Sequence, residues 1–120
     1  MKRKTMWTIM TAFALAALLA PGAIFAAEWS NVTLVDSHCA QKANVKENPD
    51  SHTRDCMLMC EKNGYGIYTS EGEYLKFDAE GSKKAYDLLK ASDKVDHLRV
   101  NVTGEREGDT LKVSTIAMTS

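Results

Sequence analysis

An apolar segment near the start of the chain limits how much of it can belong to a folded domain. Three basic residues at positions 2–4 precede it, its apolar core is continuous over residues 12–20, and a Pro-Gly pair followed by small residues ends it. This layout is typical of a cleavable secretory signal, and the apolar run is shorter than the roughly 20 residues that a membrane-spanning helix needs. We therefore expect residues 1–26 to be a cleaved signal peptide. Residues 27–120 then form one domain, exported to the periplasm or the extracellular space without a membrane anchor.

The expected mature domain is small and slightly acidic. It has 94 residues, with 12 Lys+Arg against 16 Asp+Glu, which is a formal charge of −4. A hydrophobic core can form at this size, but it is small, and a covalent or metal cross-link would stabilise it. The acidic balance argues against a surface that binds a polyanion, so no nucleic-acid partner is expected.

Alternating apolar and polar residues predict five strands, and the spacing of apolar residues predicts two short helices. The strands are expected over residues 29–37, 65–69, 73–77, 98–103 and 111–116, and the helices over residues 51 or 53 to 62 and over 82–91. The polar segment 40–50 is expected to be a loop. Between Val113 and Ile116 the inward positions change parity, which predicts a β-bulge.

The order of these elements predicts a mainly β fold with two short helices. Five strands with a helix between the third and the fourth are typical of an OB-like, partly open barrel. Here a helical insertion, which contains the cysteines, separates strands 1 and 2. The alternative is a five-stranded sheet that is packed on one face by two helices.

Three cysteines, Cys39, Cys56 and Cys60, constrain the chemistry of the insertion. In an exported protein they are expected to be oxidised, metal-bound or reactive. One helical turn separates Cys56 from Cys60 and places their Cβ atoms about 5–6 Å apart, too far for a disulfide unless the helix unwinds. Cys39 can pair with either of them, closing a loop of about twenty residues that contributes roughly 3 kcal/mol. Both pairings stay open, and each leaves one thiol that could link two chains into a disulfide-bonded dimer.

The same segment offers a metal-binding alternative. His52, Cys56 and Cys60 lie at positions i, i+4 and i+8 and would share one face of a helix, which His38 and Cys39 at the end of the first strand could reach. Three thiolates with an imidazole suit a tetrahedral Zn²⁺ site, and thiolates also suit Cu(I). The C-x3-C spacing is not the C-x2-C of zinc ribbons or of thiol redox motifs. The sequence therefore favours a structural disulfide over a metal site.

Aromatic side chains offer a possible ligand-binding surface, because OB barrels bind ligands across exposed strands and their flanking loops. The candidates are Trp29, Tyr65, Tyr68 and Tyr74, for which packing within the strands is the favoured role. The sequence contains no nucleophile-elbow, zinc-protease or phosphate-loop motif. We expect no enzymatic activity and no cofactor, Zn or Cu being the alternative.

Some motifs of the chain resemble those of a known group of proteins. Residues 35–39 (Val-Asp-Ser-His-Cys), the C-x3-C pair and the closing segment 100–116 are similar to motifs of small exported bacterial single-domain OB-like proteins that have no assigned biochemical function. The resemblance covers nearly the whole expected mature chain and implies its location and fold, but no reaction. That group tends to have Gly and His where this chain has Ala40 and Ala43.

Together these features favour a small binding or interaction domain of the cell envelope, stabilised by a disulfide from Cys39 to Cys56 or Cys60. Its partner would be an envelope ligand or protein. The alternative is a periplasmic protein that binds Zn or Cu through its cysteines and histidines.

Overall fold

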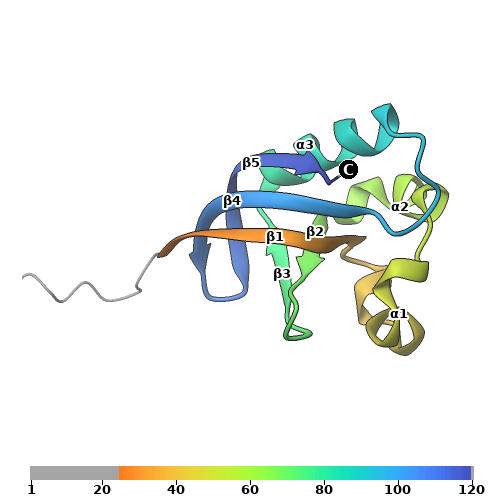
Figure 1. The fold of residues 1–120 in the computed structure, drawn as a ribbon, viewed down its shortest axis with the longest axis horizontal. Coiled ribbons are helices and arrows are strands. Elements are labelled where there is room, and N and C mark those ends of the chain that lie inside the picture. Colours follow the sequence, from red (N-terminus) through yellow and green to blue (C-terminus); the bar gives the residue numbers. More distant parts are fainter. Residues whose placement is uncertain (1–24, 120) are drawn as a thin grey trace, which may run out of the picture.

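Five strands close into a barrel in the computed structural model, which describes residues 25–119 (Figure 1). They are β1 (Phe25–Asp36), β2 (Tyr65–Tyr68), β3 (Tyr74–Phe77), β4 (Arg99–Glu107) and β5 (Thr110–Met118), in the spatial order β1-β2-β3-β5-β4. All neighbouring strands pair antiparallel except β3 and β5, whose short ladder is parallel. The prediction of a mainly β, OB-like barrel is confirmed. The expected signal peptide lies outside the described residues except for its last two positions, which begin β1.

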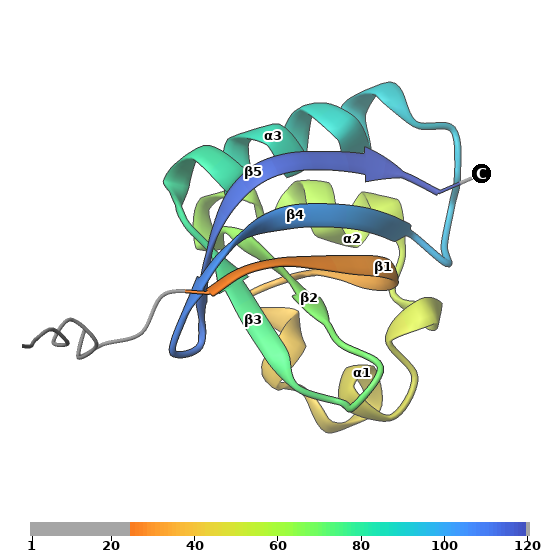
Figure 2. The same ribbon diagram turned by 60° about the vertical axis from the view of Figure 1, so that its left-hand side comes forward.

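The insertion between β1 and β2 is helical, as expected, and it contains one more helix than expected. It holds α1 (Ala43–Glu47), α2 (Arg54–Met59) and 3₁₀ turns over Cys39–Gln41, Pro49–Ser51 and Glu61–Asn63. Helix α3 (Ala79–Ala91) follows β3 and precedes β4 in the chain. In space it runs beside α2, whereas α1 lies apart from both helices (Figure 2). In residues 25–119 no helix combines the length and the apolar character needed to cross a bilayer.

Two groups of buried side chains hold the fold together. The larger group fills the barrel and is covered by α3 through Ala85 and Leu89. The smaller group joins the insertion to the outside of β1 and β2, and its members are Val35, Cys39, Ala40, Val45 and Tyr68. Burial of Val45 in this second core explains why α1 forms in a polar segment that was predicted to be a loop, since packing of a single apolar face stabilises a short helix.

The last two strands carry the predicted bulge. Thr103 is opposite Thr115 and Gly104 is opposite Val113, so Ser114 is the extra residue. The strand predicted over residues 98–103 extends further, and Gly104 lies within β4, where an added Cβ would be 2.2 Å from the backbone oxygen of Lys112. The glycine is therefore needed for the close approach of β5.

Ionic hydrogen bonds fasten the insertion to the barrel. Asp50 accepts two bonds from the Arg99 guanidinium, with Nη2–Oδ2 and Nε–Oδ1 distances of 2.7 and 3.1 Å, and a third from Thr33 at 3.0 Å. The bonds from Arg99 hold the pKa of Asp50 below its usual value. On the other side, Arg54 Nε donates to the carbonyl of Leu89 in α3 at 2.7 Å. The insertion thus has a defined position relative to the end of β1.

Candidate functional site

The end of β1 carries a carboxylate with no solvent exposure. Asp36 Oδ2 accepts a hydrogen bond from the backbone N–H of Cys39 at 2.8 Å, and Oδ1 lies 2.7 Å from His52 Nε2. Burial raises the pKa of Asp36, but the hydrogen bonds from His52 and Cys39 outweigh burial and leave the pKa below its usual value. Asp36 is therefore a buried anion whose partners all belong to the insertion.

His52 reaches Asp36 because it is not part of α2, and this corrects the prediction of a shared helical face. The Oγ1 of Thr53 caps α2 by accepting a bond from the N–H of Cys56 at 3.3 Å, so the helix begins after Thr53. His52 precedes the cap with an extended backbone (φ −74°, ψ 132°), and its side chain is only 8% exposed. Cys60 follows the end of α2 with a non-helical backbone. His52, Cys56 and Cys60 therefore do not form one row.

The three cysteines are free thiols that divide into a pair and a single residue. Cys39 is buried, and Cys60 packs against the same small core, whereas Cys56 is exposed. The thiols of Cys39 and Cys60 are close enough for each to influence the other's pKa. Burial and, to a lesser extent, the charge of Asp36 raise the pKa of Cys39 to about 11. The same two causes raise the pKa of Cys60, so both thiols are protonated at neutral pH.

Donor atoms from separate parts of the chain meet at this point. A carboxylate oxygen of Asp36, the Sγ of Cys39 and a ring nitrogen of His52 all lie within 4.8 Å of one another. Cys60 lies near both Asp36 and Cys39, because both side chains influence the pKa of its thiol. We call these four residues the Asp36 cluster. Thiol, imidazole and carboxylate groups are ligands of transition metals, and they can be brought together here because β1 ends where the insertion begins.

Sequence reasoning named three members of this cluster and missed Asp36. The signal for it was the Asp-Ser-x-Cys segment, in which the acidic residue directly follows an apolar strand. The predicted set of metal ligands also included His38 and Cys56. Both lie outside the Asp36 cluster in the structure, because His38 and Cys56 are exposed. An exposed histidine next to a strand end has nothing to hold it near the buried thiols.

The tyrosines that were candidates for a ligand face instead pack and donate hydrogen bonds. Tyr65 is fully buried, and its hydroxyl donates to the carbonyl of Met57 at 2.7 Å. Tyr68 is 7% exposed and packs against Tyr74 with ring centroids 5.1 Å apart. Both Tyr68 and Tyr74 donate to backbone carbonyls at the start of the insertion or the end of β1. Trp29 is partly buried against the barrel core.

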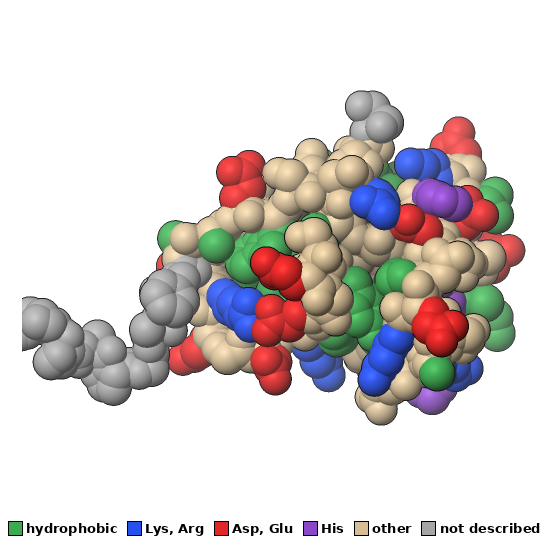
Figure 3. All heavy atoms as spheres, turned by 60° about the horizontal axis from the view of Figure 1, so that its bottom comes forward, with side chains coloured by type: hydrophobic (Ala, Val, Ile, Leu, Met, Phe, Trp, Pro, Cys, Tyr) green, Lys and Arg blue, Asp and Glu red, His purple; other side chains and the backbone are tan. Residues whose placement is uncertain are grey.

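The surface outside the cluster has mixed charge on the face drawn in Figure 3, where acidic and basic side chains alternate without a broad basic area.

Comparisons with protein-family models, with curated proteins and with solved structures found no match to this chain.

Proposed function

We propose that the protein is a small exported domain that binds a thiophilic transition-metal ion, Zn²⁺ or Cu⁺, through the Asp36 cluster. The observation that carries this proposal is the convergence of donor atoms of Asp36, Cys39 and His52 within 4.8 Å, with the Cys60 thiol beside them. The OB-like barrel and the docked insertion act as the rigid support for these groups.

The donor set matches the chemistry of these ions. Zn²⁺ takes four ligands in a tetrahedron and accepts thiolate sulfur, imidazole nitrogen and carboxylate oxygen, and Cu⁺ favours thiolates. Metal ligation removes the proton from each thiol, and Zn²⁺ then offsets two of the three negative charges of the two thiolates and the carboxylate. The buried position of Asp36 and Cys39 supports a closed, structural type of site, because such sites fill all four positions with protein groups.

A second candidate uses the same two sulfurs without a metal. In it the protein is a binding or interaction domain of the cell envelope, and a Cys39–Cys60 disulfide joins the beginning and the end of the insertion. The closeness of these thiols and the exposure of Cys56 favour this pairing over Cys39–Cys56. A small-molecule disulfide would take up the two electrons and two protons, and the closed loop would contribute about 3 kcal/mol. The exposed Cys56 would then be free to link two chains.

Titration of the reduced, purified protein with Co²⁺ and then Zn²⁺ tests the first candidate. We expect one ion per chain, a sulfur-to-cobalt charge-transfer absorption, and loss of that absorption when Zn²⁺ displaces Co²⁺. The variant Cys60→Ser should lose the absorption, and the matched variant Cys56→Ser should keep it. A titration with no sulfur-to-metal absorption would refute metal binding through these thiols.

The state of the sulfurs in protein recovered from its own compartment distinguishes the two candidates. Alkylation under denaturing conditions, with a chelator and without a reductant, should label three thiols if the protein carries a metal there. It should label Cys56 alone if Cys39 and Cys60 form a disulfide. The second result would favour the interaction domain over the metal-binding one.

A further inference from the structure

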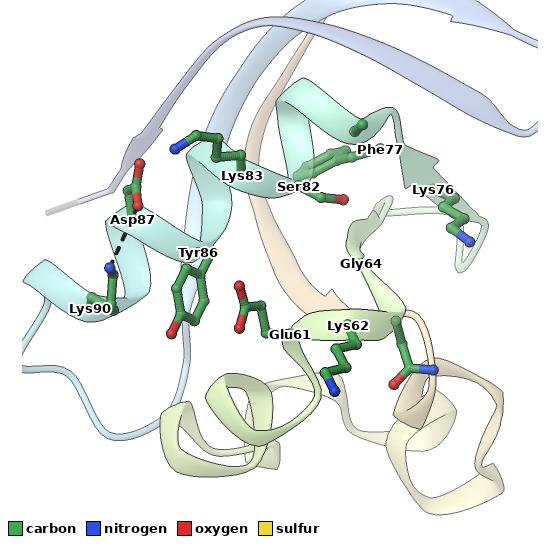
Figure 4. A pocket seen from close by; sticks show the side chains of 12 residues that line it. Glu61, Lys62, Gly64, Lys76, Phe77, Ser82, Lys83, Tyr86, Asp87 and Lys90 are labelled. Atoms are coloured by element: carbon green, nitrogen blue, oxygen red, sulfur yellow. Dashed lines mark ion pairs between the residues drawn. The ribbon is translucent and has the colours of Figure 1, made fainter.

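A cleft of about 640 Å³ opens between the turn after α2, strand β3 and helix α3, and it shares no residue with the Asp36 cluster. Figure 4 shows its walls, with Lys62 on the turn, Lys76 at β3, and Lys83 and Tyr86 on α3. The half-buried ring of Tyr86 supplies apolar surface to the lining. This volume lies in the range of small-molecule sites, which are about 300–1,000 Å³.

The residues around the cleft carry a charge opposite to that of the domain. Four lysines line it, the three named above and Lys90, together with two acidic residues, Glu61 and Asp87. The lining therefore has a formal charge of +2, whereas the domain as a whole is acidic. Within residues 25–119, Lys90 pairs with Asp87 at 3.9 Å, and Lys62, Lys76 and Lys83 form no ion pair.

Two of these four lysines, Lys83 and Lys90, lie on α3. Lys83, Tyr86 and Lys90 lie at positions i, i+3 and i+7, which share a helical face. The ammonium group of Lys90 lies 4.7 Å from the centre of the Tyr86 ring. The adjacent Lys84 points elsewhere, because its Nζ donates to the carbonyl of Ser114 on β5 at 3.1 Å. Flexible lysine stems let the unpaired ammonium groups close over an occupant of the cleft.

We propose that this cleft, which we call the lysine-rimmed cleft, binds a small organic anion with an aromatic body. The negative group pairs with ammonium groups of the rim, which Lys62, Lys76 and Lys83 supply, and the aromatic body contacts the Tyr86 ring. The pairing is attractive because an anion relieves the repulsion among like charges at the rim.

The fluorescent probe anilinonaphthalene sulfonate, which has this chemistry, tests the proposal on the purified protein. We expect one saturable site, with amide NMR shifts on probe binding confined to the turn after α2, β3 and the first turns of α3. The triple variant Lys62→Gln/Lys76→Gln/Lys83→Gln should bind about tenfold more weakly, as expected for the loss of three exposed ionic contacts. The control Lys112→Gln removes an exposed lysine of β5 outside the cleft and should leave affinity unchanged.

Competition separates charge alone from the proposed aromatic anion. Benzoate should displace the probe at concentrations where inorganic phosphate does not. Equal displacement by phosphate would overturn the aromatic part of the proposal. Unchanged affinity in the triple variant, or NMR shifts spread over other faces, would overturn the site. Because Cys60 does not line the cleft, the variant Cys60→Ser should bind the probe with the affinity of the wild type even if it binds no metal.

Discussion

The thermal stabilisation that Zn²⁺ confers should depend on Cys60 and not on Cys56. The two substitutions, Cys60→Ser and Cys56→Ser, replace the same atom four residues apart in sequence. Cys60 packs beside Cys39 and Asp36, whereas Cys56 is exposed on α2. Any effect of serine on the chain in general is therefore shared by both variants, and the difference between them reports on the cluster.

The expected size of the difference follows from the number of ligands. Structural Zn²⁺ sites of four ligands are worth about 10–16 kcal/mol, so one thiolate contributes roughly 2.5–4 kcal/mol, which corresponds to about a hundredfold or more in affinity. At a free Zn²⁺ concentration of about 100 Kd, binding stabilises the folded state by about 2.7 kcal/mol. A hundredfold weaker site retains only about 0.4 kcal/mol of this. For a domain of this size the lost 2.3 kcal/mol or so corresponds to roughly 9–18 °C in Tm.

Calorimetric or circular-dichroism melts of reduced protein, with Zn²⁺ buffered by a chelator, measure this quantity. The wild type and Cys56→Ser should show the full rise in Tm on metal addition, and Cys60→Ser should show almost none. The reasoning is refuted if the three proteins gain the same stability from Zn²⁺, or if Cys56→Ser is the variant that loses it.

Three further predictions concern proton release, the docking of the insertion and the barrel. Zn²⁺ binding at pH 7 should release about two protons, since burial holds the pKa of Cys39 near 11 and raises that of Cys60. Calorimetry in buffers of different ionisation enthalpy measures the number of protons released. A release near zero would exclude thiolate ligation. The variant Arg99→Gln should destabilise the protein by about 1 kcal/mol, a modest value because Arg99 is 37% exposed. Arg99 lowers the pKa of Asp50 in the folded protein, so this contribution is fully present above the unfolded pKa of about 4. It should decline below that pH and be lost as the pH falls through the lower folded pKa, so urea unfolding should show a smaller effect of the variant at pH 3 than at pH 7. The variant Gly104→Ala should cost about 2–3 kcal/mol, because its Cβ would meet a backbone oxygen of β5 at 2.2 Å, and a Tm within 2–3 °C of the wild type would contradict the close approach.

The barrel was predictable because its strands carry a local signal. Alternation in β4 and β5 reflects which side chains face the core, and the parity change after Val113 marks the bulge that the structure places at Ser114. Helix α3 was also predictable in its position, although its true start depends on Asp78, whose side chain caps the helix by accepting the N–H of Gly81 at 3.0 Å. Such patterns are visible in a sequence because each involves residues that are near one another along the chain.

The Asp36 cluster was only partly predictable, because its members are joined by contacts that the sequence does not encode locally. Loop entropy differs too little between a Cys39–Cys56 and a Cys39–Cys60 closure to choose between them. Two tertiary features decide which groups meet in the cluster. Thr53 caps the beginning of α2, so His52 lies outside the helix. The second core around Val45 packs the insertion against β1. Periodicity along the chain was thus enough to define the barrel, whereas the grouping of sulfur, imidazole and carboxylate arose from packing between segments distant in sequence.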